Sequence, residues 1–214
     1  MKYIIIVLIV LIGGGIFMYS ATREKAPAVP QKEYKVVAFG DSLTAGFKVD
    51  PKDNYPTILE QRLKTINPNI TIVNMGVSGD TSAQGLARID SVIAEKPDVV
   101  LLCLGANDLL RSLSPFEAKK NIESIIVQLQ AKGIVVVLLG VKTSINNTPE
   151  YRKEFDAIYP DLAEKYNLTL IPSFLSGVVL NGKLTIPDHL HPNAAGYLKI
   201  VDENIFPEIK NMFK

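Results

Sequence analysis

Short apolar runs and longer stretches with helical spacing alternate along most of the chain. The short runs are rich in valine, isoleucine and leucine and end at turn-forming residues, which is typical of strands buried on both faces of a parallel sheet. The longer stretches have the length of crossover helices. The predicted strands are residues 35–39, 70–74, 98–104, 134–139 and 168–171, and the predicted helices are residues 54–65, 81–95, 114–131, 149–166 and 192–212.

This alternation predicts one α/β domain of three layers, with a five-stranded parallel sheet between two layers of helices. Right-handed crossovers limit the topology to a doubly wound, flavodoxin-like arrangement. The chain shows no internal repeat and no low-complexity tract.

The N-terminal segment has a different pattern. Residues 3–19 carry no charge and follow Lys2, and as a helix they would be about 25 Å long, at the short limit of what spans a bilayer. Residues 1–21 are therefore predicted to be a membrane anchor or a signal segment. The poor A-x-A arrangement around residues 18–22 favours a single-pass anchor over a cleaved signal followed by secretion.

Residues 22–33 are charged and contain spaced prolines, so they are predicted to link this segment to a domain that spans residues 34–214. Lys2 and the free amine are expected to stay in the cytoplasm. The domain is then expected on the periplasmic or extracellular face of the cytoplasmic membrane.

Composition excludes some kinds of partner and site. Lys and Arg number 23 against 22 Asp and Glu, so no field of one sign favours a nucleic-acid partner. The single cysteine, Cys103, lies in an apolar run and is expected to be a small buried side chain rather than a nucleophile. One cysteine and two histidines do not have the spacing of a zinc site.

Four stretches place polar or small residues where a predicted strand ends or the last helix begins. They hold Ser42 after the first strand, Gly79 after the second, Asn107 after the third, and Asp188 with His191 before the last helix. Taken singly, the glycine and asparagine stretches have an ordinary explanation as turns. A serine nucleophile needs a base, an orienting group and oxyanion donors from elsewhere in the chain.

The last stretch holds both histidines of the chain, His189 and His191, beside Asp188 and ahead of Pro192. Proline suits the first position of a helix, so His191 is expected at or next to the helix start. A three-residue offset lets the Asp188 carboxylate reach back to the His191 ring, whereas His189 is its direct neighbour and is expected to point elsewhere. The sequence therefore favours His191 as the base.

Together these stretches resemble the ordered sequence blocks of the SGNH, or GDSL, hydrolase family. The longer strings Gly-Asp-Ser-Leu-Thr-Ala-Gly, Gly-Val-Ser-Gly-Asp-Thr-Ser and Leu-Gly-Ala-Asn-Asp are most similar to a bacterial branch of periplasmic arylesterases, acyl-CoA thioesterases and lysophospholipases. The resemblance spans the whole domain, from Gly40 to His191.

The resemblance implies a serine hydrolase that works without a cofactor or a metal. It assigns Ser42 as nucleophile, His191 as base and Asp188 as the residue that orients the base. It also assigns an oxyanion hole to the Ser42 N–H, the Gly79 N–H and the Asn107 side-chain amide. Asp41 and Asp108 are expected to support turns rather than to act as acid or base.

Two positions depart from the family pattern. Residues 140–147 replace a segment that contains Met-x-x-Pro in relatives, which leaves the substrate preference open. His189 stands where a glycine is usual after the aspartate of the last block.

The similarity of the longer strings to this branch implies small acyl esters, thioesters or lysophospholipids as substrates, and the apolar Leu109 and Leu110 beside Asn107 agree with it. One alternative is a carbohydrate or cell-wall O-acetylesterase, which shares the machinery. Another is a non-catalytic flavodoxin-like binding module, which would cradle a phosphate at the loop after the first strand and need no histidine.

Overall fold

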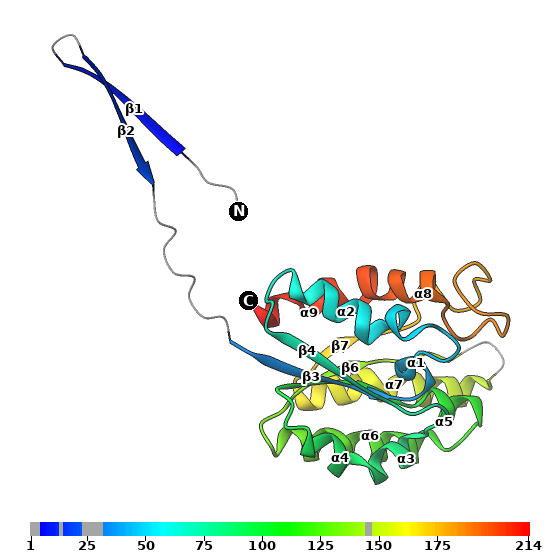
Figure 1. The fold of residues 1–214 in the computed structure, drawn as a ribbon. Helices are drawn as coiled ribbons and strands as arrows, with labels where there is room; N and C mark the ends of the chain where they lie inside the picture. Colours follow the sequence, from blue (N-terminus) through cyan, green and yellow to red (C-terminus); the bar gives the residue numbers. More distant parts are fainter. Residues whose placement is uncertain (1–4, 13–14, 23–31, 144–146) are drawn as a thin grey trace. The chain divides into compact units, whose positions relative to one another are not determined.

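The computed structural model describes residues 5–12, 15–22, 32–143 and 147–214. The chain divides into two compact units, Met1–Lys32 and Glu33–Lys214. The larger unit is built on a five-stranded parallel sheet with the strand order β4-β3-β5-β6-β7 (Figure 1). The predicted fold class is therefore confirmed.

The strands lie within two residues of the predicted ranges. They are β3 (Tyr34–Gly40), β4 (Ile70–Gly76), β5 (Val99–Cys103), β6 (Val135–Leu139) and β7 (Thr169–Ile171). All five residues of β5 are buried, as are the last five of β3. The continuous apolar runs are explained by this burial on both faces.

Helices cover both faces of the sheet (Figure 1). One face carries α2 (Tyr55–Lys64), α8 (Ala194–Lys199), the π-helical turn η2 (Ile200–Ile205) and α9 (Phe206–Ile209), while the other carries α3 (Ser82–Ala87), α4 (Ile89–Ala94), α6 (Pro115–Gln130) and α7 (Pro149–Tyr166). The short elements are α1 (Ser42–Ala45), α5 (Ala106–Leu110), and the 3-10 turns η1 (Pro51–Asp53) and η3 (Lys210–Phe213).

Two of the predicted helices differ from those in the structure. The helix predicted over residues 81–95 breaks at Arg88, whose backbone φ of −114° separates α3 from α4. The last helix begins at Ala194 because the Asn193 side chain caps it by accepting from the Gly196 N–H. Pro192 therefore precedes the cap and does not occupy the first helical position, and His191 lies two residues before the cap.

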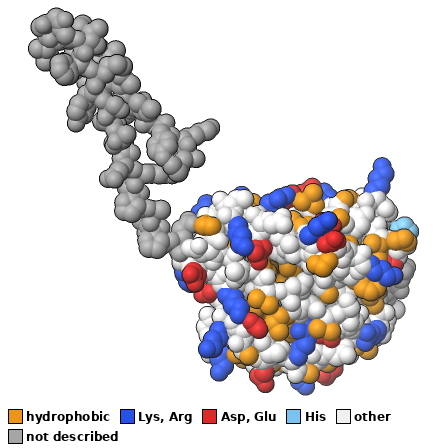
Figure 2. Space-filling model, viewed as in Figure 1, with side chains coloured by type: hydrophobic (Ala, Val, Ile, Leu, Met, Phe, Trp, Pro, Cys, Tyr) orange, Lys and Arg blue, Asp and Glu red, His pale blue; other side chains and the backbone are white. Residues whose placement is uncertain are grey.

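Charged side chains of both signs are interspersed over the face of the molecule seen in Figure 2. This distribution agrees with the formal net charge of +1. Buried apolar residues form one core that lies between the sheet and its two helix layers. Among the described residues, this core runs from Val36 to Phe213.

The smaller unit contains two antiparallel strands, β1 (Ile5–Ile12) and β2 (Gly15–Thr22), with Ile5 opposite Thr22. The structure therefore does not support the predicted transmembrane helix over residues 3–19. Isoleucine and valine favour strands, and the glycines at 13–15 disfavour a continuous helix. Within the described residues, no helix has both the length and the apolar character needed to cross a membrane.

A chain shortened to begin at Glu33 is expected to fold on its own, because the described core lies entirely within the larger unit. Thermal unfolding followed by circular dichroism should be cooperative, with a midpoint within about 3 °C of the full-length value. An insoluble product, or one without a cooperative transition, would contradict the proposed domain boundary.

Candidate active site

Three neighbouring strands bring the first three predicted site residues to one edge of the sheet. Because β3, β4 and β5 are parallel, their carboxyl ends meet there, with Gly40 paired to Gly76 on one side and to Cys103 on the other. Ser42 follows β3, Gly79 follows β4 and Asn107 follows β5. In open α/β sheets, ligands bind at this edge, where the order of strands reverses.

Ser42 is the first residue of α1, a helix of four residues. Asp41 caps this helix, since its Oδ1 accepts from the Leu43 N–H at 2.9 Å. The helix lies directly against the end of β4, because a Cβ added to Gly76 would meet the Ala45 nitrogen at 2.2 Å. Glycine at position 76 therefore allows the helix that carries Ser42 to approach the neighbouring strand.

Ser42, His191 and Asp188 form a continuous hydrogen-bonded array. The Ser42 Oγ lies 2.9 Å from His191 Nε2, and His191 Nδ1 lies 2.7 Å from Asp188 Oδ2. An ionised carboxylate only accepts hydrogen bonds, so Nδ1 carries the proton and Nε2 is free to accept the serine hydroxyl. The array has the order of groups that activates a serine.

Backbone groups also hold Asp188 in place. Its Oδ1 accepts from the N–H groups of Leu190 and His191, both at 2.9 Å. Desolvation opposes ionisation of Asp188, but these two N–H groups and the His191 ring outweigh it and lower the pKa of the carboxyl. The orienting group is therefore a stable carboxylate at neutral pH.

An aromatic ring packs on the histidine. The centroid of the Phe47 ring lies 4.8 Å from that of His191, with 47° between the planes. Phe47 follows Gly46, which ends α1 in the left-handed conformation at φ +82° and turns the chain. The segment that directly follows the helix of Ser42 thus supplies a side chain that packs on the His191 ring and limits its rotation.

Gly79 occupies a tight turn in the loop after β4. Its φ of +91° lies in a region that side chains disfavour, which explains the glycine, and its carbonyl accepts from Arg111 Nη2 at 2.9 Å. The Asp80 N–H closes the turn by donating to the Val77 carbonyl at 3.1 Å.

Asn107 lies in the first turn of α5, and its amide nitrogen points to the same loop. Its Nδ2 donates to the Asp80 carbonyl at 3.0 Å and contacts Asp41 Oδ2 at 3.4 Å. These contacts join the segments that follow β3, β4 and β5, and they fix the plane of the amide.

A second set of hydrogen bonds, between buried residues, connects the segments that follow β4 and β5. The Asp108 carboxylate accepts from the Ser82 N–H at 2.7 Å and from the Ser82 hydroxyl at 2.6 Å. Asn121 of α6 donates to that hydroxyl at 3.1 Å. Asp108 therefore supports the loop, which agrees with the supporting role expected from the sequence.

Burial raises the pKa of Asp41 to about 7, and the carboxylates of Asp108 and Asp80 contribute to the rise. The Leu43 N–H opposes this effect but does not cancel it. Asp41 is fully buried, so a substantial fraction of it is neutral at physiological pH.

His189 lies outside the hydrogen-bonded array. It is exposed, its φ is +58°, and its ring lies beside Gly182. This positive φ is a conformation that glycine adopts readily and other residues adopt less often. The rings of His189 and His191 have different surroundings, since His191 contacts Ser42 and Asp188.

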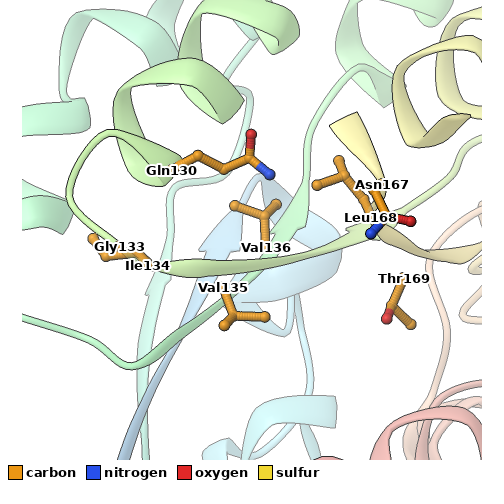
Figure 3. Close-up of a pocket in the computed structure, with 8 residues that line it drawn as sticks. All are labelled: Gln130, Gly133, Ile134, Val135, Val136, Asn167, Leu168 and Thr169. Atoms are coloured by element: carbon orange, nitrogen blue, oxygen red, sulfur yellow. The ribbon is translucent and has the colours of Figure 1, made fainter. Parts of the chain in front are cut away.

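The remaining sequence features take no part in the Ser42–His191–Asp188 array or lie outside the described residues. Cys103 is buried, and burial raises the pKa of its thiol. A hollow of about 350 Å³ between the amino ends of β6 and β7, lined by residues such as Gln130 and Asn167, lies at the opposite edge of the sheet (Figure 3). In the departing segment 140–147, residues 144–146 are outside the described residues.

The structure adds contacts that the sequence analysis did not identify, namely Phe47 on His191, Arg111 on Gly79, and Arg88 within the break between α3 and α4. Each residue type is ordinary at a surface or a helix end.

A sequence model of the GDSL-like Lipase/Acylhydrolase family matches residues 38–199. The chain is 34% identical to Esterase TesA of Pseudomonas aeruginosa over 82% of its length and 87% of the relative. It is 32% identical to thioesterase 1/protease 1/lysophospholipase L1 of Escherichia coli K12, over 74% of its length and 75% of the relative. The solved structure of AlinE4, an SGNH-hydrolase family esterase, is 41% identical with a TM-score of 0.71 and covers 86% of this chain and 96% of AlinE4.

The raised pKa of Asp41 predicts a pH dependence of stability. Unfolding returns this carboxyl to its ordinary value of 3.8, so between about pH 4 and pH 7 the folded state binds more protons than the unfolded state. The contribution of Asp41 to the free energy of unfolding is therefore expected to fall as the pH rises through this window. Asp41→Asn removes the group from this equilibrium.

We expect Asp41→Asn to become more stable relative to the wild type by about 2–3 kcal/mol between pH 5 and pH 8. Urea unfolding of both proteins at the two pH values measures this difference, and other titrating groups cancel in the comparison. An unchanged difference would show that Asp41 ionises at an ordinary pH.

Proposed function

The chain belongs to the GDSL-like lipase/acylhydrolase family, and on that premise we propose that it cleaves carboxylic esters and thioesters of acyl chains through an acyl-enzyme on Ser42. The observation that supports this most directly is the distance of 2.9 Å between Ser42 Oγ and His191 Nε2 in the array that ends at Asp188. A phosphate-binding module would have no use for this array.

In the first step Ser42 Oγ attacks the acyl carbonyl carbon and passes its proton to His191 Nε2. Asp188 stabilises the imidazolium through Nδ1–H and holds the ring in the productive tautomer. The tetrahedral intermediate then collapses, the bond to the leaving oxygen or sulfur breaks, and His191 returns the proton to the leaving alcohol or thiol.

The carbonyl oxygen becomes negatively charged in this step and needs donors that are already in place. We assign this role to the Ser42 N–H, the Gly79 N–H and the Asn107 amide. One N–H of this amide donates to the Asp80 carbonyl at 3.0 Å, and the other, which makes only a long contact of 3.4 Å with Asp41 Oδ2, would donate to the oxyanion. Removal of one such donor costs about 3–4 kcal/mol of transition-state stabilisation in serine hydrolases. The bonds that fix the Gly79 turn and the Asn107 amide keep these donors at the edge of the sheet.

In the second step water attacks the acyl-enzyme, with His191 as general base, and releases a carboxylic acid and free Ser42. The names of the compared relatives include esterase, thioesterase and lysophospholipase. Exposed apolar side chains flank the proposed donors, with Val77 in the loop of Gly79 and Leu110 in the helix of Asn107. This surrounding favours acyl chains over sugar acetates.

We also propose that the hydrolase domain works outside the cytoplasm. The support is the uncharged run of residues 3–19 after Lys2, followed by a charged linker that contains prolines. The segment would act either as a single-pass anchor or as a cleaved signal.

Ser42→Ala and His191→Ala are each expected to lower turnover by several orders of magnitude without unfolding the protein, because they remove the nucleophile and the base. His189→Ala is the matched control and should change turnover only modestly, since its ring lies outside the array. These roles are measured as initial rates on p-nitrophenyl esters of graded chain length. An acyl-thioester, a lysophospholipid and an acetylated sugar, assayed beside them, measure the substrate preference.

Near-normal activity in Ser42→Ala would reject the acyl-enzyme. If His189→Ala is inactive while His191→Ala is active, the proposed triad is wrong. A preference for acetylated sugars would contradict the proposed specificity for acyl chains and would favour the alternative function, a carbohydrate or cell-wall O-acetylesterase.

Full-length protein expressed in a bacterial host is expected to be accessible to protease added to spheroplasts, because the domain would lie outside the cytoplasmic membrane. Membrane fractionation with N-terminal sequencing separates an anchored chain that keeps Lys2 from a soluble chain that begins near residue 20. Protection from protease in intact spheroplasts would contradict the proposed location.

A further inference from the structure

Arg88 lies in the break between α3 and α4, and its guanidinium reaches the carboxyl edge of the sheet. Its Nε donates to Asp80 Oδ2 at 2.6 Å, its Nη1 to the Met75 carbonyl at 2.9 Å and its Nη2 to the Gly40 carbonyl at 2.9 Å. The side chain is 22% exposed. All three nitrogens of the guanidinium are therefore engaged in a largely enclosed place.

The three acceptors belong to the segments that carry the proposed reacting groups. Gly40 ends β3, two residues before Ser42, and Met75 lies at the end of β4. Asp80 is the neighbour of Gly79. One planar side chain thus bonds to the nucleophile strand, to the strand beside it and to the loop that follows.

Asp80 extends this connection to the third strand. While its side chain accepts from Arg88, its backbone carbonyl accepts from Asn107 Nδ2 at 3.0 Å. A displacement of Asp80 would therefore move both proposed loop donors, the Gly79 N–H through the chain and the Asn107 amide through its hydrogen bond.

The geometry requires arginine rather than any cation. A guanidinium presents a fixed fork of donors, whereas an ammonium group is a compact charge on a flexible stem. The Arg88 fork also lies over the Phe39 ring at 4.5 Å, which limits its tilt. Lysine at this position would keep the charge but could not reproduce three directed bonds at once.

We propose that Arg88 is a positioning residue of the oxyanion hole, which holds Gly79 and Asn107 at a fixed place relative to Ser42. This inference rests on the proposed function and adds a residue that does not touch the substrate. Donors that shift by about 1 Å can lower a rate by about 10²-fold, so a small displacement of the loop is enough to affect catalysis.

The test compares Arg88→Lys with Arg62→Lys in the full-length protein. Arg62 is a matched control, because it forms a two-point pair with Asp202, with bonds of 2.8 and 3.1 Å, and both partners lie on helices that cover the sheet. We expect Arg88→Lys to lower kcat on p-nitrophenyl butyrate by about 10- to 100-fold while KM changes less than about threefold. Arg62→Lys should keep both constants within about twofold.

A second readout reports on the hole itself. The rate at which a p-nitrophenyl alkylphosphonate modifies Ser42 should fall in parallel with kcat, because its phosphoryl oxygen needs the same donors. Asp80→Asn should show the same pattern, and it decides the question if Arg88→Lys does not fold. Circular dichroism identifies the folded variants.

A role in stability alone would lower the unfolding midpoint and leave kcat of the folded protein unchanged. The proposal is therefore overturned if the folded Arg88→Lys and Asp80→Asn variants keep kcat within about twofold of the wild type, or if Arg62→Lys loses as much. Failure of the proposed function gives a different result, because the Ser42→Ala variant would then remain active whatever the effect of the Arg88 variant.

Discussion

The position of β3 between β4 and β5 is the constraint on which the rest of the site depends. A parallel sheet whose strand order reverses at one strand leaves a crevice there, since the two crossovers depart to opposite faces. In this protein the segments after β3, β4 and β5 supply Ser42, Gly79 and Asn107 to that crevice. The helix layers then need only to hold these segments, and the loop before α8 adds His191, which contacts Ser42.

Three buried aspartates lie at the edge of the sheet where the proposed reaction forms a negatively charged oxygen. Three negative charges there would repel this oxygen. Each aspartate has a different partner that reduces this repulsion. Asp80 is paired with Arg88, and Asp108 receives both donors of Ser82. Within the part of the chain that the structure describes, Asp41 forms no ion pair, and its raised pKa means that it takes up a proton more readily than an ordinary aspartate, which reduces the repulsion. The three aspartates therefore have different partners, namely the Arg88 guanidinium for Asp80, the two donors of Ser82 for Asp108 and the Leu43 N–H for Asp41.

The sequence predicted the sheet, its strands and the stretches that meet at its edge, because continuous apolar runs and the turns after them are local signals. It could not predict the interruption of the helix at Arg88, because the groups that accept hydrogen bonds from this side chain lie on β3, on β4 and in the loop after β4. These contacts are distant in the sequence. The contact of Phe47 with His191 is hidden for the same reason. For the N-terminal segment the uncharged apolar run predicts a helix, whereas the structure has the strands β1, rich in isoleucine and valine, and β2.

Ser42 and His191 are separated by 149 positions in the chain, yet their side chains are in hydrogen-bond contact. A contact that closes so long a loop carries a large entropic penalty and forms only when the intervening layers have assembled. Every strand of the sheet after β3 lies between these two residues. A nascent or partly folded chain therefore carries an unactivated serine, and hydrolytic competence becomes a property of the completed domain alone.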